Sequence, residues 1–230
     1  MNIKAHIPNS LTLLNLLSGA IGIIYVLDGQ IYWGAYFVLI SAALDFLDGF
    51  VARILKVQGE LGKQLDSLAD VISFGLLPGI VLYAMSESAA EPSWITYITL
   101  AVPAFSAYRL AKFNLDTRQT DRFIGLPTPA NALLITTLPF LATEWVRLGT
   151  WLTSPLFLAI LAVVLSYLLI AEIPLIALKF KNFSLRDNVY RYLLIALGIG
   201  MAVFLGLAGI PFVILAYILL SIIENRLENK

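Results

Sequence analysis

Residues 45–70 read DFLDGFVARILKVQGELGKQLDSLAD and set four carboxylates inside an otherwise apolar chain. On insertion scales each charged side chain costs about 2.5–3.5 kcal/mol at the centre of a membrane helix, so the four need partners. Only three basic side chains lie between the two acidic pairs, too few to neutralise them. The segment therefore predicts a divalent cation, which prefers oxygen ligands and binds carboxylates from neighbouring helices. The four acidic residues are Asp45, Asp48, Asp66 and Asp70.

The composition is that of an integral membrane protein. Of 230 residues, 60% are hydrophobic and 13% are charged, and the mean hydropathy is +0.87. The net charge is zero and no basic stripe is present, so nucleic acid is not an expected partner. The absence of cysteine excludes disulfides and thiolate chemistry. The opening MNIKAHIPNS has no small-residue cleavage site, so we expect no signal peptide.

A membrane-spanning helix needs about 20 mostly apolar residues. On that scale we expect one all-α membrane domain over residues 1–230, a polytopic helix bundle of about eight spans. The last two segments are short, and GLAGIP (206–211) joins them tightly, so a bent hairpin or an oligomer contact also fits. The expected spans are 9–27, 32–55, 65–86, 94–113, 128–147, 154–178, 188–205 and 210–226.

Two residue classes predict the same orientation. With the end of the motif in the cytoplasm, only Arg147 of the 15 lysines and arginines falls outside, which agrees with the positive-inside rule. The tryptophans fall near the outer interface, where indole rings are enriched. Both termini and the active site are therefore expected at the cytoplasmic face, of the inner membrane if the protein is bacterial. The tryptophans are Trp33, Trp94, Trp145 and Trp151.

The spacing of the aspartates predicts a shared site. Asp45 and Asp48 are three residues apart and Asp66 and Asp70 are four apart, so each pair lies on one helix face. The first pair ends the second span and the second pair opens the third, so the two faces can meet. Four carboxylates there could hold two divalent cations and leave room for substrate phosphates. Two metals about 3.5–4 Å apart would neutralise a diphosphate and stabilise its leaving group.

Small residues and one arginine continue this pattern. Gly49, Ala52 and Arg53 extend the stripe that begins at Asp45, and Gly62 opens the next helix. The small side chains would let a diphosphate approach the helices closely. Arg53 would present a charged fork to a phosphate.

The string DxxDGxxAR, eight residues, then GxxxDxxxD resembles the motif of the CDP-alcohol phosphotransferases, without departure at these positions. The resemblance implies a membrane enzyme in which an alcohol hydroxyl displaces CMP from a CDP-linked lipid. It implies two divalent cations, Mg²⁺ or Mn²⁺, with all four aspartates as ligands and Asp70 also as the base. It implies that the nucleotide-diphosphate pocket is lined by Gly49, Ala52, Arg53 and Gly62.

Three further strings resemble the phosphatidylserine synthase branch of that family. They are IPNSLTLLNLLSG (7–19), DSLADVISFGLLPG (66–79), and RLAKFN (109–114) followed by FIGLPTPAN (123–131). This resemblance covers roughly residues 7–135. It implies CDP-diacylglycerol and L-serine as substrates, phosphatidylserine and CMP as products, and a homodimer in the bilayer.

Other residues are candidates for the two substrate pockets. Arg109 lies inside the fourth span and would hold the carboxylate of serine or a phosphate, or else snorkel to the interface. Asn9 and Thr12 resemble positions at the cytidine end, or else cap or pack the first helix. The loop from Arg118 onward would cap the polar substrate, shaped by its Gly and Pro residues. The acceptor candidates are Arg109, Lys112, Asn114, Gly125 and Pro127; Lys112 is closer to water and would bind the acceptor or else snorkel.

Alternative functions stay open from the residues alone. Glycerol 3-phosphate, inositol phosphate or inositol could replace serine, and Arg118 and Arg122 could add charge for a phosphorylated acceptor. A membrane prenyltransferase also uses Asp-rich motifs with magnesium, but its motifs would lie far apart in sequence. A cation transporter would place its charges near the bilayer midplane on broken helices, whereas here they gather at one interface.

Overall fold

The computed structural model describes residues 3–88, 94–115, 123–176, 184–185 and 188–228. These residues are almost entirely helical, which confirms the predicted all-α class, and two short strands pair antiparallel. The elements are η1 (Ile3–Ala5), α1 (His6–Leu27), α2 (Trp33–Leu55), α3 (Glu60–Asp70), η2 (Val71–Leu76), α4 (Leu77–Glu87), η3 (Trp94–Leu100), α5 (Ala101–Leu115), β1 (Phe123–Ile124), α6 (Thr128–Glu144), α7 (Val146–Leu152), α8 (Pro155–Ile170), β2 (Pro174–Leu175), α9 (Val189–Leu205), η4 (Gly206–Gly209) and α10 (Ile210–Glu228).

The first helix packs closely on its neighbours because glycines face the contacts. A Cβ atom at Gly22 of α1 would lie 2.8 Å from the Cβ of Phe37 on α2 and 2.9 Å from a methyl carbon of Leu77. A Cβ at Gly19 would lie 2.6 Å from Ser73 Oγ. Small residues at such contacts allow the close helix packing that is common in membrane bundles. α1 is therefore held against both α2 and the helix that follows it.

The third predicted segment is one continuous helix, Glu60–Glu87, made of α3, η2 and α4. Its middle part, η2, is a π-helix that begins directly after Asp70. Pro78 lies just beyond η2 and has no N–H to donate to the preceding turn. Membrane helices accommodate a proline through such local π adjustments, and single π turns are frequent at functional sites. The π-helix directly after Asp70 is therefore one indication that this part of the helix belongs to a functional site.

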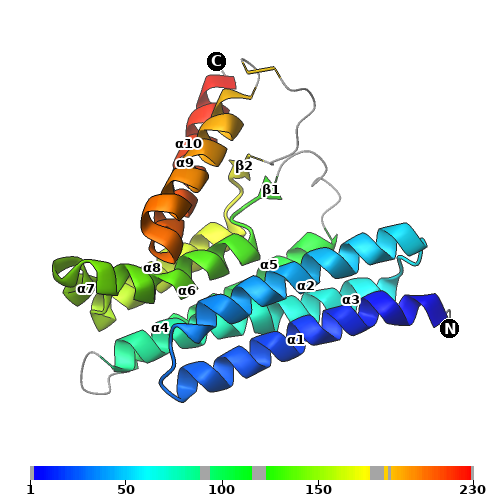
Figure 1. Ribbon diagram of the computed structural model, residues 1–230, viewed down its shortest axis with the longest axis horizontal. Helices are drawn as coiled ribbons and strands as arrows, with labels where there is room; N and C mark the ends of the chain where they lie inside the picture. The colour runs from blue at the N-terminus through cyan, green and yellow to red at the C-terminus, as the bar shows by residue number, and fades with distance from the viewer. Residues whose placement is uncertain (1–2, 89–93, 116–122, 177–183, 186–187, 229–230) are drawn as a thin grey trace.

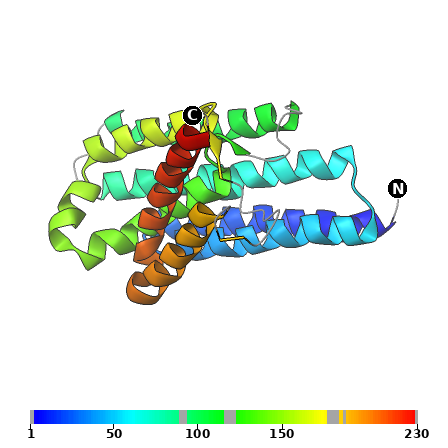
Figure 2. The same cartoon turned by 90° about the horizontal axis from the view of Figure 1, so that it is seen from above.

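The helices form a bundle with a second hairpin set across it. α1, α2 and the α3–α4 helix run side by side in alternating directions, and α6 packs across α2 and α4 (Figure 1). Residues 56–59 join α2 to α3 at what we call the motif end; the N-terminus lies there, and α7 lies at the opposite end. The α9–α10 hairpin is steeply inclined to the bundle in both views (Figures 1 and 2). One apolar core extends from Val26 on α1 to Ile218 on α10.

Within the described residues, three helical stretches are long and apolar enough to cross a membrane: His6–Leu27, Glu60–Glu87 and Val189–Leu227. The last of these is not a single rod, because the chain turns back at Gly206, whose φ of +55° favours glycine. α2 has a similar length but includes charged residues of the motif. The predicted number of about eight spans and the predicted cytoplasmic termini therefore stay predictions.

Two predicted segments differ from the observed helices. The segment expected at 154–178 ends as α8 at Ile170, and the chain then extends into β2, which pairs with β1. Pro174 opens β2 and cannot continue a helix without loss of a backbone hydrogen bond. The segment expected at 94–113 begins as the 3₁₀-helix η3 before α5. The β1–β2 pair, which the sequence analysis did not predict, lies where α6 starts.

Candidate active site

The connection between α2 and α3 brings the acidic residues of the two helices together. Lys56 ends α2 in the left-handed conformation, with φ 54° and ψ 44°, and Gly59 is extended before α3 begins. This short reversal sets the two helices side by side. One carboxylate oxygen from each of Asp45, Asp48 and Asp66 lies within 4.8 Å of the other two. The predicted convergence of the two helix faces is therefore observed for these three residues, and Asp70 follows one turn after Asp66.

Helix α1 holds one carboxylate of each pair. Thr12 Oγ1 donates a hydrogen bond of 2.6 Å to Asp48 Oδ2, and Asn15 Nδ2 donates one of 3.3 Å to Asp70 Oδ1. Thr12 and Asn15 are three residues apart and so lie on the same face of α1. All four of these side chains are buried. Such outer hydrogen bonds hold a metal-binding carboxylate in one orientation.

Asn15 is a functional candidate that the sequence analysis missed. Its backbone carbonyl accepts hydrogen bonds from Ser73 Oγ at 2.9 Å and from Ser41 Oγ at 3.4 Å, so α2 and η2 both anchor on it. Its side-chain oxygen is buried without a hydrogen-bond partner among the described residues. The signal was present in the sequence, because a second polar residue follows Thr12 at a helical spacing of three inside an apolar run.

The donor set fits a divalent cation. No lysine or arginine in the described part of the chain forms an ion pair with the four aspartates. Three carboxylates that share a site without basic partners repel one another, and a cation removes that repulsion. Their oxygens are hard ligands of the kind that Mg²⁺ and Mn²⁺ prefer. The residues present therefore fit such an ion.

The residues predicted to line the nucleotide pocket border the acidic cluster at the motif end. A Cβ at Gly49 would meet only Arg53 Nη1, at 3.7 Å, and a Cβ at Gly62 would meet only Asn9 Oδ1, at 3.4 Å. Gly49 and Gly62 thus each face a polar side chain and little else. Ala52 is half-buried and Arg53 is exposed, so the guanidinium is accessible to a ligand from water. This arrangement leaves room beside the carboxylates for a phosphorylated group.

Arg109, the first acceptor candidate, is buried in the protein. Only 8% of it is exposed, so it does not snorkel to the surface. Its Nη1 donates a hydrogen bond of 3.4 Å to Thr128 Oγ1 at the start of α6, and its guanidinium lies 5.9 Å from the ring centroid of Phe113. Its Nε has no hydrogen-bond partner among the described residues. α5, which carries Arg109, packs on η2, and η2 begins directly after Asp70.

The other acceptor candidates form no hydrogen bond with Arg109 within the described residues. Lys112 forms a solvent-exposed ion pair of 3.2 Å with Glu172, a kind of pair that contributes little to stability. Asn114 donates a hydrogen bond of 2.7 Å to Ser67 Oγ, and its backbone carbonyl accepts one of 2.8 Å from Lys63 Nζ. Lys112 and Asn114 therefore tie α5 to its neighbours near the motif end. Arg118 and Arg122 lie outside the described residues.

Gly125 and Pro127 shape the start of α6. Gly125 has a φ of +75°, and a Cβ there would lie 2.6 Å from the carbonyl oxygen of Leu169, so only glycine fits. Its N–H donates to the carbonyl of Ile173 at 2.9 Å. Pro127 then caps α6 in an extended conformation. The two residues thus set the position of Thr128 beside Arg109.

A group of buried polar atoms near Arg109 has no hydrogen-bond partner within the described residues. α5 and α6 both pack on η2. The two helices run in opposite directions (Figure 1), so the residue one turn before Arg109 and the residue one turn after Thr128 lie at a similar depth in the bundle. Ser106 and Asn131 occupy these two positions. Buried polar groups are almost always paired, and an unpaired one costs about 1–3 kcal/mol. The unpaired atoms here are Ser106 Oγ, Arg109 Nε, Asn131 Oδ1 and Asn131 Nδ2.

Ser106 and Asn131 were also missed by the sequence analysis. Each is a small polar residue at a helical spacing of three from a residue that contacts the site, which is a signal that the sequence contains. Taken alone, that spacing is common in ordinary helices. Their burial without partners is what marks them as candidates.

The model of the CDP-alcohol phosphatidyltransferase family matches residues 5–171. This range holds the acidic cluster, Arg109 and the start of α6. The chain belongs to this family of transferases, which confirms the resemblance of the motif. Together with the apolar helices, membership identifies an integral membrane protein.

Several curated relatives are similar to this chain. A CDP-diacylglycerol–serine O-phosphatidyltransferase of Mycobacterium leprae is 36% identical over 176 residues, which cover 74% of this chain and 57% of that protein. One of Helicobacter pylori is 31% identical over 229 residues, with 94% and 90% covered. An archaetidylserine synthase of Methanothermobacter thermautotrophicus is 35% identical over 136 residues, with 56% and 55% covered. The aligned part thus spans little more than half the length of the mycobacterial relative.

Proposed function

We propose that this protein transfers the phosphatidyl group of CDP-diacylglycerol to the hydroxyl of L-serine, giving phosphatidylserine and CMP. The observation that carries the proposal is the convergence of Asp45, Asp48 and Asp66 within 4.8 Å, beside a buried Asp70, in a member of this family. The names of the relatives from M. leprae and H. pylori support serine as the acceptor.

The acidic residues account for activation of the donor lipid. Asp45, Asp48 and Asp66, with Asp70, would hold two divalent cations, Mg²⁺ or Mn²⁺, which neutralise the diphosphate and stabilise CMP as it leaves. Arg53 would bind a phosphate oxygen from the aqueous side, and the absence of side chains at Gly49 and Gly62 would give the diphosphate access.

Asp70 has the surroundings of a general base. Asn15 holds one of its oxygens at 3.3 Å, so the other can face a hydroxyl within hydrogen-bond reach. In the reaction the serine oxygen forms a bond to the phosphorus of the phosphatidyl group, and the bond from that phosphorus to the CMP oxygen breaks. The hydroxyl proton passes to Asp70, and CMP leaves with the electron pair of the broken bond.

The buried polar groups without partners near Arg109 would bind an amino-acid acceptor. Arg109 would bind the carboxylate of serine, because its buried Nε has a donor to offer and a guanidinium matches a carboxylate in shape. Ser106 and Asn131 supply further donors and acceptors at a similar depth, which suits a small zwitterion. Arg109 lies on α5, which packs on η2, and η2 begins directly after Asp70, so a molecule held by Arg109 would lie on the side of the bundle that carries the base.

A second candidate differs only in the donor. The similarity to an archaetidylserine synthase favours a donor with other lipid chains and the same acceptor. The site described here binds the nucleotide diphosphate and the acceptor, and both candidates share these parts. Comparison of CDP-diacylglycerol with its archaeal ether analogue as donor distinguishes them.

We also propose how the protein lies in the membrane. It would have about eight spans, with both termini and the active site at the cytoplasmic face. It would form a homodimer, as the family resemblance implies. The distribution of basic residues supports the orientation. The four tryptophans are exposed, as expected of interfacial residues, with 41–75% of each accessible. Reaction of single cysteines introduced at Arg226 and Trp151 with a membrane-impermeant reagent tests the orientation.

The decisive experiment measures CMP release by the purified protein in detergent with CDP-diacylglycerol and Mg²⁺ or Mn²⁺. Serine, glycerol 3-phosphate, inositol phosphate and inositol are supplied in turn. We expect metal-dependent release with serine, and loss of it in Asp45→Asn. The matched control is Asp28→Asn, because Asp28 is an exposed aspartate at the far end of α1. Release with another acceptor alone would refute the choice of serine, and release with none would refute the proposed reaction.

A further inference from the structure

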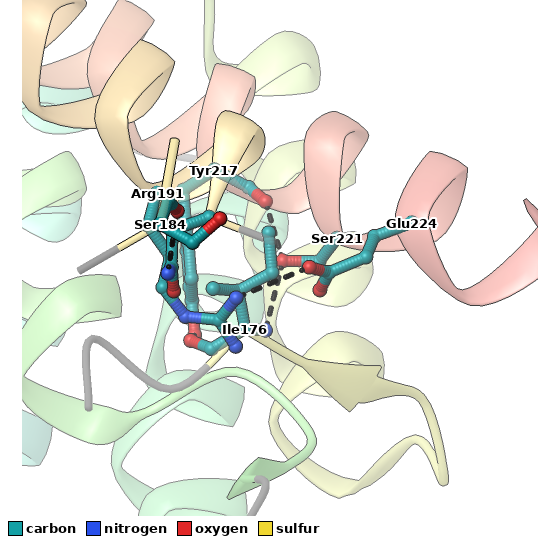
Figure 3. Close-up of polar contacts among 7 residues, drawn as sticks. Ile176, Ser184, Arg191, Tyr217, Ser221 and Glu224 are labelled. Atoms are coloured by element: carbon teal, nitrogen blue, oxygen red, sulfur yellow. Dashed lines mark hydrogen bonds and ion pairs between the residues drawn. The ribbon is translucent and has the colours of Figure 1, made fainter. Parts of the chain in front are cut away.

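The C-terminal helix contributes a row of buried polar residues that the family match does not include. The match ends at residue 171, whereas α10 begins at Ile210. Tyr217, Ser221 and Glu224 follow at helical spacings on one face of α10, and each is at most 8% exposed. Polar side chains buried on an otherwise apolar helix need partners. Figure 3 shows that they point toward the segment around Ile176.

Two of these residues, Tyr217 and Ser221, bind Ile176, the residue directly after strand β2. Tyr217 Oη donates a hydrogen bond of 3.1 Å to the carbonyl oxygen of Ile176, and the N–H of Ile176 donates one of 3.1 Å to Ser221 Oγ (Figure 3). Asn225 Nδ2 donates to the carbonyl of Pro174. Arg191 Nη1 lies 3.4 Å from Glu224 Oε1 and so joins α9 to α10. The hairpin therefore holds the chain at β2 through its backbone groups.

The strand β2 in turn holds the segment that reaches Arg109. In the β1–β2 pair Ile124 lies opposite Pro174, and the next N–H, that of Gly125, donates to the carbonyl of Ile173. Thr128 follows three residues later and accepts the hydrogen bond from Arg109.

We propose that Tyr217 and Ser221 of α10 are positioning residues for the acceptor subsite. The inference rests on the proposed function. Tyr217 and Ser221 hold β2, β2 holds the Gly125–Thr128 segment, and this segment sets where the guanidinium of Arg109 lies. The nucleotide-lipid side of the site, built by α1, α2 and α3, does not depend on these contacts.

The test compares Tyr217→Phe and Ser221→Ala with Tyr83→Phe as the matched control. Tyr83 Oη also donates a hydrogen bond of 3.1 Å, to Glu87 Oε1 near the end of α4, but takes no part in this chain of contacts. Loss of one hydrogen bond is expected to raise the KM for serine about three- to tenfold. The KM for CDP-diacylglycerol and the metal requirement should not change, and Tyr83→Phe should leave all three constants unchanged.

A second measurement separates positioning from simple destabilisation. Arg109→Lys is combined with Tyr217→Phe, and the effects on the KM for serine should be less than additive, because both changes disturb one contact set. The proposal would be refuted if an α10 variant raised the KM for serine and the KM for CDP-diacylglycerol equally. It would also be refuted if the effects of Arg109→Lys and Tyr217→Phe on the KM for serine were fully additive in the double variant. An unchanged KM for serine in both α10 variants would refute it as well.

The outcomes for the two proposals are distinct. A wild-type protein that does not turn over serine refutes the proposed function, and the α10 comparison is then made with whichever acceptor is used. A wild-type protein that uses serine normally, with α10 variants that behave as Tyr83→Phe does, refutes only the role of α10.

Discussion

Replacement of Thr12 by valine removes a hydroxyl from the interior of the site and keeps its volume. Thr12 is 3% exposed, and its Oγ1 lies 2.6 Å from Asp48 Oδ2 and 3.1 Å from the carbonyl oxygen of Pro8. A hydrogen bond to a charged group contributes about 1.5–3 kcal/mol, which corresponds to about 10- to 150-fold in a binding constant. Loss of a residue that orients a metal ligand typically weakens metal binding by about 10–100-fold. We therefore expect the half-saturating Mg²⁺ or Mn²⁺ concentration to rise within that range.

Two assays check this expectation. CMP release is titrated with metal at saturating substrates, and the thermal stabilisation of the protein by metal alone is measured without turnover. Thr137→Val is the matched control, because Thr137 is fully buried on α6 and its hydroxyl donates only to backbone carbonyls of its own helix. A Thr12→Val protein with an unchanged metal requirement would show that the hydrogen bond to Asp48 does not tune the site. If Thr12→Val and Thr137→Val raised the half-saturating metal concentration equally, the cause would be a general destabilisation of the fold.

Three further substitutions test the roles of individual groups. Asp70→Asn should abolish CMP release while a circular dichroism spectrum stays helical, and near-normal activity would exclude Asp70 as the base. Arg109→Lys should raise the KM for serine more than that for CDP-diacylglycerol, since a point charge replaces a planar fork; steady-state kinetics with each substrate varied decides it. Asn131→Leu should raise the melting temperature without acceptor, because it removes a buried group that costs about 1–3 kcal/mol unpaired, and should also raise the KM for serine. A lower melting temperature together with an unchanged KM for serine would contradict the hypothesis that Asn131 is an unpaired buried group that binds the acceptor.

The sequence predicted the acidic cluster well because its geometry is mostly local. Asp45 and Asp48 share a helix face by spacing alone, and a connection as short as residues 56–59 leaves few ways for α2 and α3 to diverge. The family resemblance was likewise readable from the motif, and the family match over residues 5–171 confirms it.

The acceptor side was predicted less completely because it is assembled from distant segments. Arg109 was chosen for the cost of a charge inside a span, and it is indeed buried. Lys112 was expected either to bind the acceptor or to snorkel to the interface, and its ammonium group pairs with Glu172 at an exposed position. Ser106 and Asn131 look ordinary in the sequence, and only their burial without partners distinguishes them. The roles of all these residues stay predictions that the proposed kinetics would test.

The sequence by itself determined the helical class, the membrane character and the acidic motif, because hydropathy, helical periodicity and spacing act over a few turns of one chain segment. Only the tertiary structure decided which donors hold the carboxylates and that α10 holds β2. Thr12 and Asp48 are 36 residues apart, Asn15 and Asp70 are 55 apart, and Tyr217 and Ile176 are 41 apart. Contacts at such separations depend on how whole helices pack, and no local pattern records them.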